Sequence, residues 1–160
     1  MPLAQCSFTL NGLRISSLIC DGRIYPAFSG EKGHENKPSD TALVKIGPLP
    51  KGSYYIVDRQ SGGRLGWLWD TAATLLNNSH RDNWFALYRN DGAIDDWTYV
   101  NGIKRGNFRL HPVGRAAISE GCITLTSPTQ FDQLRTYLKS QAPQTIPGTT
   151  IKYYGTVEVK

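Results

Sequence analysis

The chain has 160 residues, a formal net charge of +5, and 39% hydrophobic against 19% charged residues. This length fits one domain with a sizeable core, and the composition excludes a disordered or low-complexity chain. No apolar run approaches the roughly 20 residues that span a bilayer, so we expect no membrane partner. Lysine and arginine are scattered, so the positive charge indicates a solvated surface, and we expect no nucleic-acid partner.

Near the N-terminus, Asn11 and Gly12 predict a two-residue hairpin turn between the segments SFTL and LRIS. This turn pairs Cys6 with Ser17, which leaves Cys20 out of register with Cys6. We therefore expect Cys6 and Cys20 to be structural thiols, bridged only if a bulge intervenes. The expected buried face of this hairpin comprises Cys6, Phe8, Leu10, Leu13 and Ile15.

Short strands are expected along the rest of the chain, because apolar residues alternate between turns rich in glycine and proline. The expected strands are residues 22–28, 43–46, 53–58, 84–88, 97–100 and 150–159, with a polar loop at 29–40 and a short helix within 64–78. A second helix begins after Ser127, an N-cap followed by Pro128 and Gln130. Its core-facing stripe is Phe131, Leu134, Tyr137 and Leu138. The predicted fold class is mostly β, with two short helices.

The most informative segment is residues 109–126, RLHPVGRAAISEGCITLT. Alternation along its two short strands places His111 on the polar side of the first strand and Cys122 on the polar side of the second. The loop between them contains Pro112, Gly114 and Gly121, so it is able to fold back and bring imidazole and sulfur together. A base beside a thiol produces the nucleophilic thiolate. The alternative is that Cys122 is a buried, inert residue, the common state of a lone cysteine.

Further residues are assigned to this candidate site. The amides of Gly121 and Cys122 are expected to stabilise an oxyanion. Ser119 or a loop carbonyl is expected to orient His111, and Gly114 gives the loop its freedom to turn.

Substrate-binding residues are expected nearby. Arg109 shares the side of His111 and is expected to bind a substrate carboxylate. Trp67 and Trp69 either wall a substrate groove or fill the core. His34 and Glu35 have no further ligand at a suitable spacing, so we expect no metal ion.

Two stretches of the chain resemble a known family. The segments HPVG (111–114) and SEGCITL (119–125) resemble the catalytic signature of L,D-transpeptidases of the YkuD type. They resemble more closely a small branch among type VI secretion effectors that attack peptidoglycan. Upstream, IGPLPKGSYY (46–55) and the motif of Phe28–Gly30 with Asn36 are similar to further family motifs. Glu120 stands where the family has a second histidine, and Thr124 where it has a basic or amide residue.

The resemblance implies a fold and an activity. The fold is a YkuD-like β-sandwich or barrel, with residues 1–160 as a single catalytic domain and no cofactor. The activity is that of an L,D-carboxypeptidase or L,D-transpeptidase, in which Cys122 attacks a peptidoglycan stem tetrapeptide and the terminal D-alanine is removed or exchanged. The implied partners are stem peptides, a secretion apparatus and an immunity protein. The N-terminus does not resemble a signal peptide, so we expect an antibacterial toxin delivered without one into the periplasm of a target bacterium.

Three alternatives remain open at this stage. In the first, the chain is a non-catalytic wall-binding module with an inert cysteine. In the second, it is a basic nuclease toxin that uses His34 or His80. A further alternative is a papain-like wall amidase using Cys20 and a later histidine. The last is disfavoured because Cys20 precedes a predicted turn instead of a helix, whose dipole would lower the thiol pKa.

Overall fold

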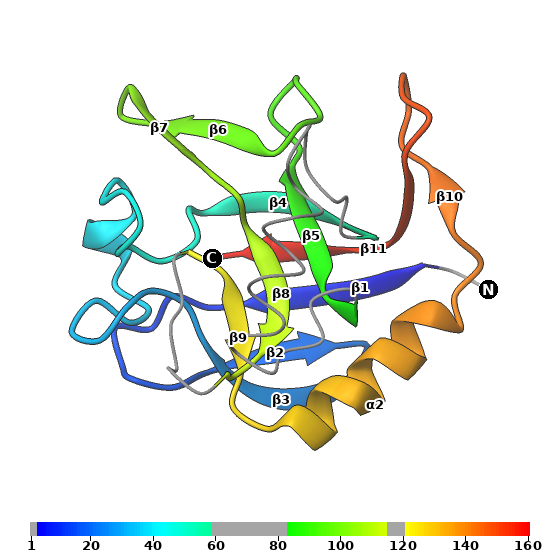
Figure 1. Ribbon diagram of the computed structural model, residues 1–160, viewed down its shortest axis with the longest axis horizontal. Coiled ribbons are helices and arrows are strands. Elements are labelled where there is room, and N and C mark those ends of the chain that lie inside the picture. The colour runs from blue at the N-terminus through cyan, green and yellow to red at the C-terminus, as the bar shows by residue number, and fades with distance from the viewer. Residues whose placement is uncertain (1–2, 59–82, 115–120) are drawn as a thin grey trace.

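The described part of the protein folds as a barrel of short strands with a helix packed against it (Figure 1). The computed structural model describes residues 3–58, 83–114 and 121–160. The strands are β1 (Ala4–Phe8), β2 (Ser16–Cys20), β3 (Arg23–Phe28), β4 (Gly52–Asp58), β5 (Phe85–Arg89), β6 (Trp97–Val100), β7 (Ile103–Gly106), β8 (Arg109–Pro112), β9 (Ile123–Leu125), β10 (Gln144–Thr145) and β11 (Lys152–Val159). The helix is α2 (Pro128–Lys139), and a 3-10 turn, η1, spans Pro38–Asp40.

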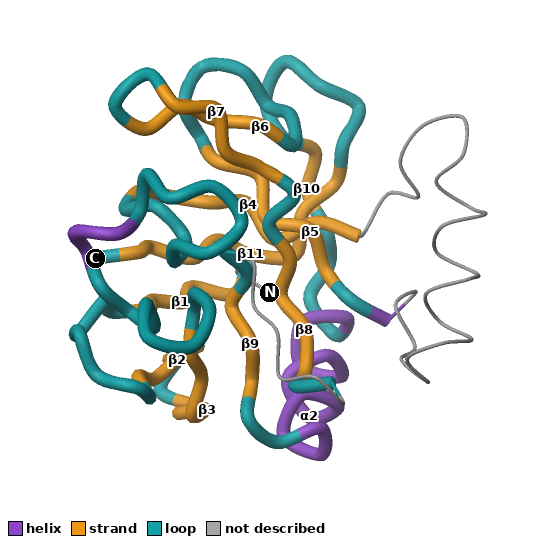
Figure 2. Tube along the Cα trace, turned by 60° about the vertical axis from the view of Figure 1, so that its left-hand side comes forward, coloured by secondary structure: helices purple, strands orange, loops and turns teal. Residues whose placement is uncertain are grey.

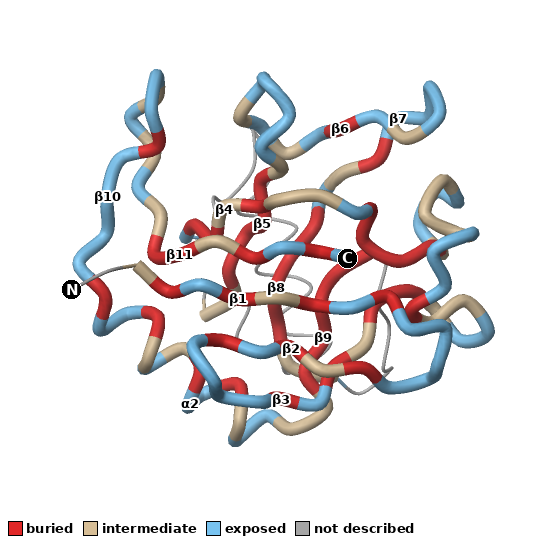
Figure 3. Tube along the Cα trace, turned by 180° about the vertical axis from the view of Figure 1, so that it is seen from behind, coloured by how far each residue is buried: buried red, intermediate tan, exposed pale blue. Residues whose placement is uncertain are grey.

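Strand pairing closes the main sheet into the barrel. The sheet order is β1-β2-β3-β9-β8-β5-β4-β11-β10, and β1 also pairs in parallel with β11. β10 is therefore an appendage, and β6 with β7 forms a separate ribbon. Inward-facing residues fill the barrel, and the buried segments run through its centre in Figure 3. The largest of these core residues include Phe8, Tyr54, Phe85, Phe108, Leu110 and Ile123. The mostly β, barrel-like fold class is confirmed.

The N-terminal hairpin differs from the prediction in its register. The partner of Cys6 is Cys20, not Ser17. Residues 9–15 form a loop instead of a two-residue turn, because other parts of the chain bind their amides. Leu10 donates its backbone N–H to the Lys160 carbonyl at 2.8 Å, and Gly12 donates to the Asn36 carbonyl at 2.7 Å.

This register places the two cysteines opposite each other, and Cys6 and Cys20 form a disulfide. The expectation of two unbridged thiols was wrong, because the longer loop removes the offset that separated them. The same loop leaves Leu13 and Ile15 exposed, so the predicted apolar face ends at Leu10. The disulfide also rules out Cys20 as the nucleophile of a papain-like amidase while the bridge is intact.

Other predicted elements can be compared directly. The strands expected near 22–28, 53–58, 84–88, 97–100 and 150–159 correspond to β3, β4, β5, β6 and β11. The strand expected at 43–46 is wrong: this segment forms turns, in which Gly47 donates its N–H to the Leu43 carbonyl at 2.9 Å. The helix expected within 64–78 lies outside the described residues.

Helix α2 begins where the sequence predicts. The Ser127 side chain accepts a hydrogen bond from the Gln130 amide at 3.2 Å and caps the first turn. Phe131, Leu134 and Leu138 are buried, so the apolar stripe faces the barrel next to β8, β9 and β11. In the part of the chain that the structure describes, no helix is long and apolar enough to cross a bilayer.

Candidate active site

Strands β8 and β9 bring the two halves of the candidate site together. They are parallel neighbours, with Leu110 opposite Ile123 and His111 opposite Thr124 (Figure 2). Leu110 and Ile123 point into the core, so His111 and Thr124 share the other face. Cys122 precedes β9 by one residue and lies two positions before Thr124, which puts it on that same face. The parallel pairing of β8 with β9 therefore brings the two segments of the candidate site side by side.

His111 is held in a fixed orientation. The residue is 6% exposed, and its ring stacks on Trp84, with centroids 4.3 Å apart and planes 22° apart. Nδ1 lies 2.7 Å from the Pro112 carbonyl, and a carbonyl oxygen only accepts, so Nδ1 carries the proton. In the neutral ring Nε2 is then the basic nitrogen, and it lies 3.4 Å from the Thr124 hydroxyl. The carbonyl beside Nδ1 belongs to Pro112, the last residue of β8, and not to the loop. Ser119, the other candidate for orienting His111, lies outside the described residues.

Cys122 lies in a positively charged environment. It is buried, with 8% of its surface exposed, and it is not part of a disulfide. Burial lowers the pKa of Arg105, and Tyr54 and Cys122 oppose this effect when they are ionised. Burial also acts to lower the pKa of Arg109, but its hydrogen bonds and charge pairing with Asp96, together with the charge of Cys122, raise it overall. Both guanidinium groups are thus close enough to interact electrostatically with the sulfur.

Gly121 allows this close approach. Its φ of +91° is a conformation that favours glycine. A Cβ at this position would lie 2.5 Å from Nη2 of Arg105 and 3.0 Å from the ring of Phe108. The space where a side chain of Gly121 would lie is therefore filled by Arg105 and Phe108. The role of the Gly121 amide in an oxyanion site stays a prediction.

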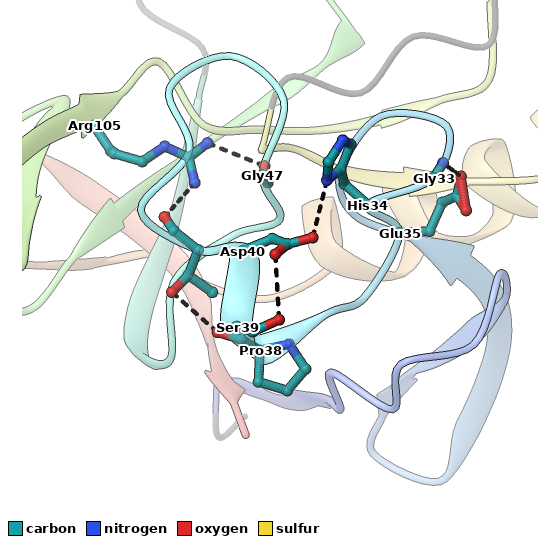
Figure 4. A network of polar contacts seen from close by, with 9 residues as sticks. Gly33, His34, Glu35, Pro38, Ser39, Asp40, Gly47 and Arg105 are labelled. Atoms are coloured by element: carbon teal, nitrogen blue, oxygen red, sulfur yellow. Dashed lines mark hydrogen bonds and ion pairs between the residues drawn. The ribbon is translucent and has the colours of Figure 1, made fainter.

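Arg105, from β7, is a component of the site that the sequence analysis missed. Its guanidinium donates to the carbonyls of Thr41 and Pro48 at 2.7 Å each and of Gly47 at 3.1 Å. Figure 4 shows it reaching into the loop that carries η1, where His34 contacts Asp40 at 2.9 Å. No pattern in the sequence marks this arginine, because its partners are backbone groups far away along the chain.

The comparison with known families adds to this geometry. The family model described as the Tlde1 domain matches residues 23–149. This chain belongs to the Tlde1-domain family. The family is one of type VI secretion effectors, so the expectation of an antibacterial effector is supported at this level. No curated protein matches the chain.

The Tlde1 match covers all predicted site residues but not the whole barrel. It begins at Arg23, so β1 and β2 precede it, and it ends before β11. These three strands nevertheless complete the barrel, because β1 pairs with both β2 and β11.

Arg109 has a partner within the Tlde1 domain. Its guanidinium binds both carboxylate oxygens of Asp96, at 2.7 and 2.8 Å, and donates to the Phe108 carbonyl. The group expected to bind a substrate carboxylate thus already binds a carboxylate of its own chain, and its role as a substrate ligand stays a prediction. Gly114 is exposed beside the site, with open space around it. Trp67 and Trp69 lie outside the described residues.

The segment Phe28–Gly30 and Asn36, which resembles a family motif, has a structural role. Asn36 is fully buried, and its side-chain oxygen accepts from the Ser29 amide at 2.9 Å while its side-chain nitrogen donates to the Leu13 carbonyl at 2.8 Å. The Ser29 hydroxyl in turn accepts from the Leu49 amide at 2.8 Å. These bonds fix the loop after β3 against the segment whose carbonyls bind Arg105.

Proposed function

We propose that this effector is a cysteine-dependent L,D-carboxypeptidase and L,D-transpeptidase acting on peptidoglycan stem tetrapeptides. The observation that carries the proposal is the parallel pairing of β8 with β9, which aligns His111 with Thr124 and puts Cys122 on the same face. The fixed tautomer of His111, with its basic nitrogen toward β9, supports its role as general base.

The proposed reaction has two steps. His111 Nε2 accepts the proton of Cys122, and the sulfur attacks the carbonyl carbon of the diamino acid at stem position three. The C–N bond to the terminal D-alanine breaks, the leaving amine takes the proton from His111, and a thioester remains. Water then hydrolyses the thioester, or the amine of another D-amino acid or stem peptide attacks it. The amides of Gly121 and Cys122 are the proposed oxyanion donors, and losing one such donor typically costs about a hundredfold or more in rate.

Further residues are proposed to orient His111 or to bind the substrate. The Pro112 carbonyl orients His111, and Ser119 is a further candidate for this role. Trp67 and Trp69 are proposed to contact the stem peptide or the glycan. Arg109 is proposed to bind a carboxylate of the substrate.

We propose the periplasm of a target bacterium as the site of action, with delivery by a secretion apparatus and protection of the producer by an immunity protein. The buried disulfide supports this compartment, because disulfides form and persist in the oxidising periplasm. The loss of tetrapeptide donors from the wall would account for toxicity.

The proposal is tested by incubating purified protein with tetrapeptide-containing wall digests and analysing the products by mass spectrometry. Wild-type protein should convert tetrapeptides to tripeptides, and added D-methionine should yield the exchanged product. Cys122→Ala and His111→Ala proteins should fold normally by circular dichroism and leave the tetrapeptides intact.

His34→Ala is the matched control. His34 also has its Nδ1 beside an oxygen, in this case a carboxylate oxygen of Asp40. It is proposed to have no part in the reaction, so trimming should persist. Unchanged trimming by Cys122→Ala would refute the assignment. Degradation of nucleic acid that is retained in Cys122→Ala but lost in His34→Ala would favour the nuclease alternative. Sedimentation with intact wall sacculi, without any product, would favour the binding-module alternative.

A further inference from the structure

Arg105 is a buried cation whose close contacts are neutral. The residue is 2% exposed, and its hydrogen-bond acceptors are three backbone carbonyls, those of Thr41, Gly47 and Pro48. Carbonyl dipoles orient a guanidinium, but they do not neutralise its charge. A buried charge is costly unless an opposite charge lies nearby.

The described residues offer few groups that could supply this charge. Their ion pairs join His34 with Asp40, Arg109 with Asp96, and Lys139 with Asp58, and none includes Arg105. The two groups whose negative charge acts on Arg105 are Tyr54 and Cys122.

Tyr54 does not fulfil this role at neutral pH. It is fully buried, and burial raises its pKa above the ordinary value of 10, so its phenol remains protonated. The phenol donates a hydrogen bond of 2.6 Å to the Pro50 carbonyl. Among the described residues this leaves the sulfur of Cys122 as the group able to become the counter-charge.

The geometry of Gly121 points the same way. Nη2 of Arg105 lies where a Cβ of this residue would be, so the guanidinium approaches the backbone immediately before Cys122. Arg109 also acts on the sulfur, but its charge is balanced by two hydrogen bonds to Asp96. Among the described residues of β8, His111 is a further titratable group on this face.

We propose that Arg105 is the positioning residue that provides the counter-charge for the Cys122 thiolate and holds the Gly121–Cys122 backbone against the η1 loop. This inference rests on the proposed role of Cys122 as a nucleophile. When the thiol ionises, its proton passes to His111 or to solvent, and the buried pair of guanidinium and thiolate becomes neutral overall. Arg105 needs no contact with substrate for this role.

The test is the pH dependence of Cys122 alkylation by iodoacetamide, followed by mass spectrometry. With Cys6 and Cys20 bridged, Cys122 is the thiol that remains to react. The wild-type midpoint should lie below the ordinary thiol value of about 8.5. Arg105→Gln should raise it by about one to three pH units, the shift associated with losing a nearby opposite charge. Arg105→Lys keeps a positive charge but loses the hydrogen bonds to the three carbonyls, so it should raise the midpoint less.

Arg89→Gln is the matched control. Arg89 likewise donates to a backbone carbonyl, that of Lys51, at 2.6 Å, and to the Thr98 hydroxyl at 3.0 Å. Neither of these contacts involves Cys122, so removal of the Arg89 charge should leave the midpoint unchanged. An unchanged midpoint in Arg105→Gln, or an equal rise in Arg89→Gln, would overturn the inference.

The wild-type protein gives an independent answer if the glutamine variant fails to fold. A wild-type midpoint at or above about 8.5 would also overturn the inference. The assay contains no peptidoglycan, so it gives a result whether or not the proposed activity on stem peptides is found. Failure of the proposed function and failure of this inference are therefore distinguishable.

Discussion

Opening the disulfide between Cys6 and Cys20 is expected to lower the free energy of unfolding by about 3 kcal/mol. The bridged positions are 14 residues apart in sequence, and closing a loop of about 15 residues removes roughly this much conformational free energy from the unfolded chain. For a chain of this size, the change corresponds to a fall in melting temperature of about 6 to 12 °C. The constraint matters for the barrel, because β1 carries Cys6 and pairs with both β2 and β11.

The assay compares thermal melts, followed by circular dichroism, with and without dithiothreitol. A Cys122→Ala background removes the third thiol and so prevents disulfide exchange, and mass spectrometry after alkylation verifies reduction. A variant that also carries Cys6→Ala and Cys20→Ala has no bridge and should not respond to the reductant. If fully reduced protein melts within about 2 °C of the oxidised protein, the loop-entropy reasoning is refuted.

Three further predictions concern single residues. Gly121→Ala should cost about 1–3 kcal/mol of stability, because it puts a Cβ against Arg105 at a backbone position with left-handed φ. Denaturant unfolding measures this loss. Gly114→Ala, at a position with open space, should stay within about 0.5 kcal/mol of wild type. Ser127→Ala should lower stability by about 1 kcal/mol through the lost cap, while Ser127→Asp retains it. Burial raises the pKa of Tyr54, so the protonated phenol contributes to the free energy of unfolding. This contribution is complete below pH 10, the ordinary pKa of tyrosine, and is lost as pH rises further. Alkaline melts should therefore show wild-type stability falling more steeply above pH 10 than that of Tyr54→Phe, and parallel curves would contradict this.

Helix α2 shows what local sequence is able to specify. Its cap uses Ser127 and the amide of Gln130, and its stripe repeats at helical spacing, so every determinant lies within a few residues. The two strands of the candidate site are also indicated by local sequence. Alternation within residues 109–126 is enough to place His111 and Cys122 each on the polar side of its own strand. The parallel pairing of β8 with β9 then gives the two residues a common face. Local patterns therefore predicted these elements.

The predictions that failed depended on distant partners. The hairpin register was wrong because the amide of Leu10 binds the Lys160 carbonyl, at the other end of the chain, and Gly12 binds Asn36. The strand expected at residues 43–46 is absent because that segment lies in the loop whose carbonyls bind Arg105. An alternation pattern does not reveal which group will satisfy a backbone amide or carbonyl, since many folds bury the same residues.

The sequence alone determined the mostly β class, the helix and the pair of residues proposed to react, because each follows from periodicity or from a short motif. Only the tertiary structure decided the disulfide, the stacking of His111 on Trp84 and the position of Arg105. Barrel closure brings together groups that are far apart along the chain, and the hydrogen bonds and charges at those meeting points exist only in the folded protein.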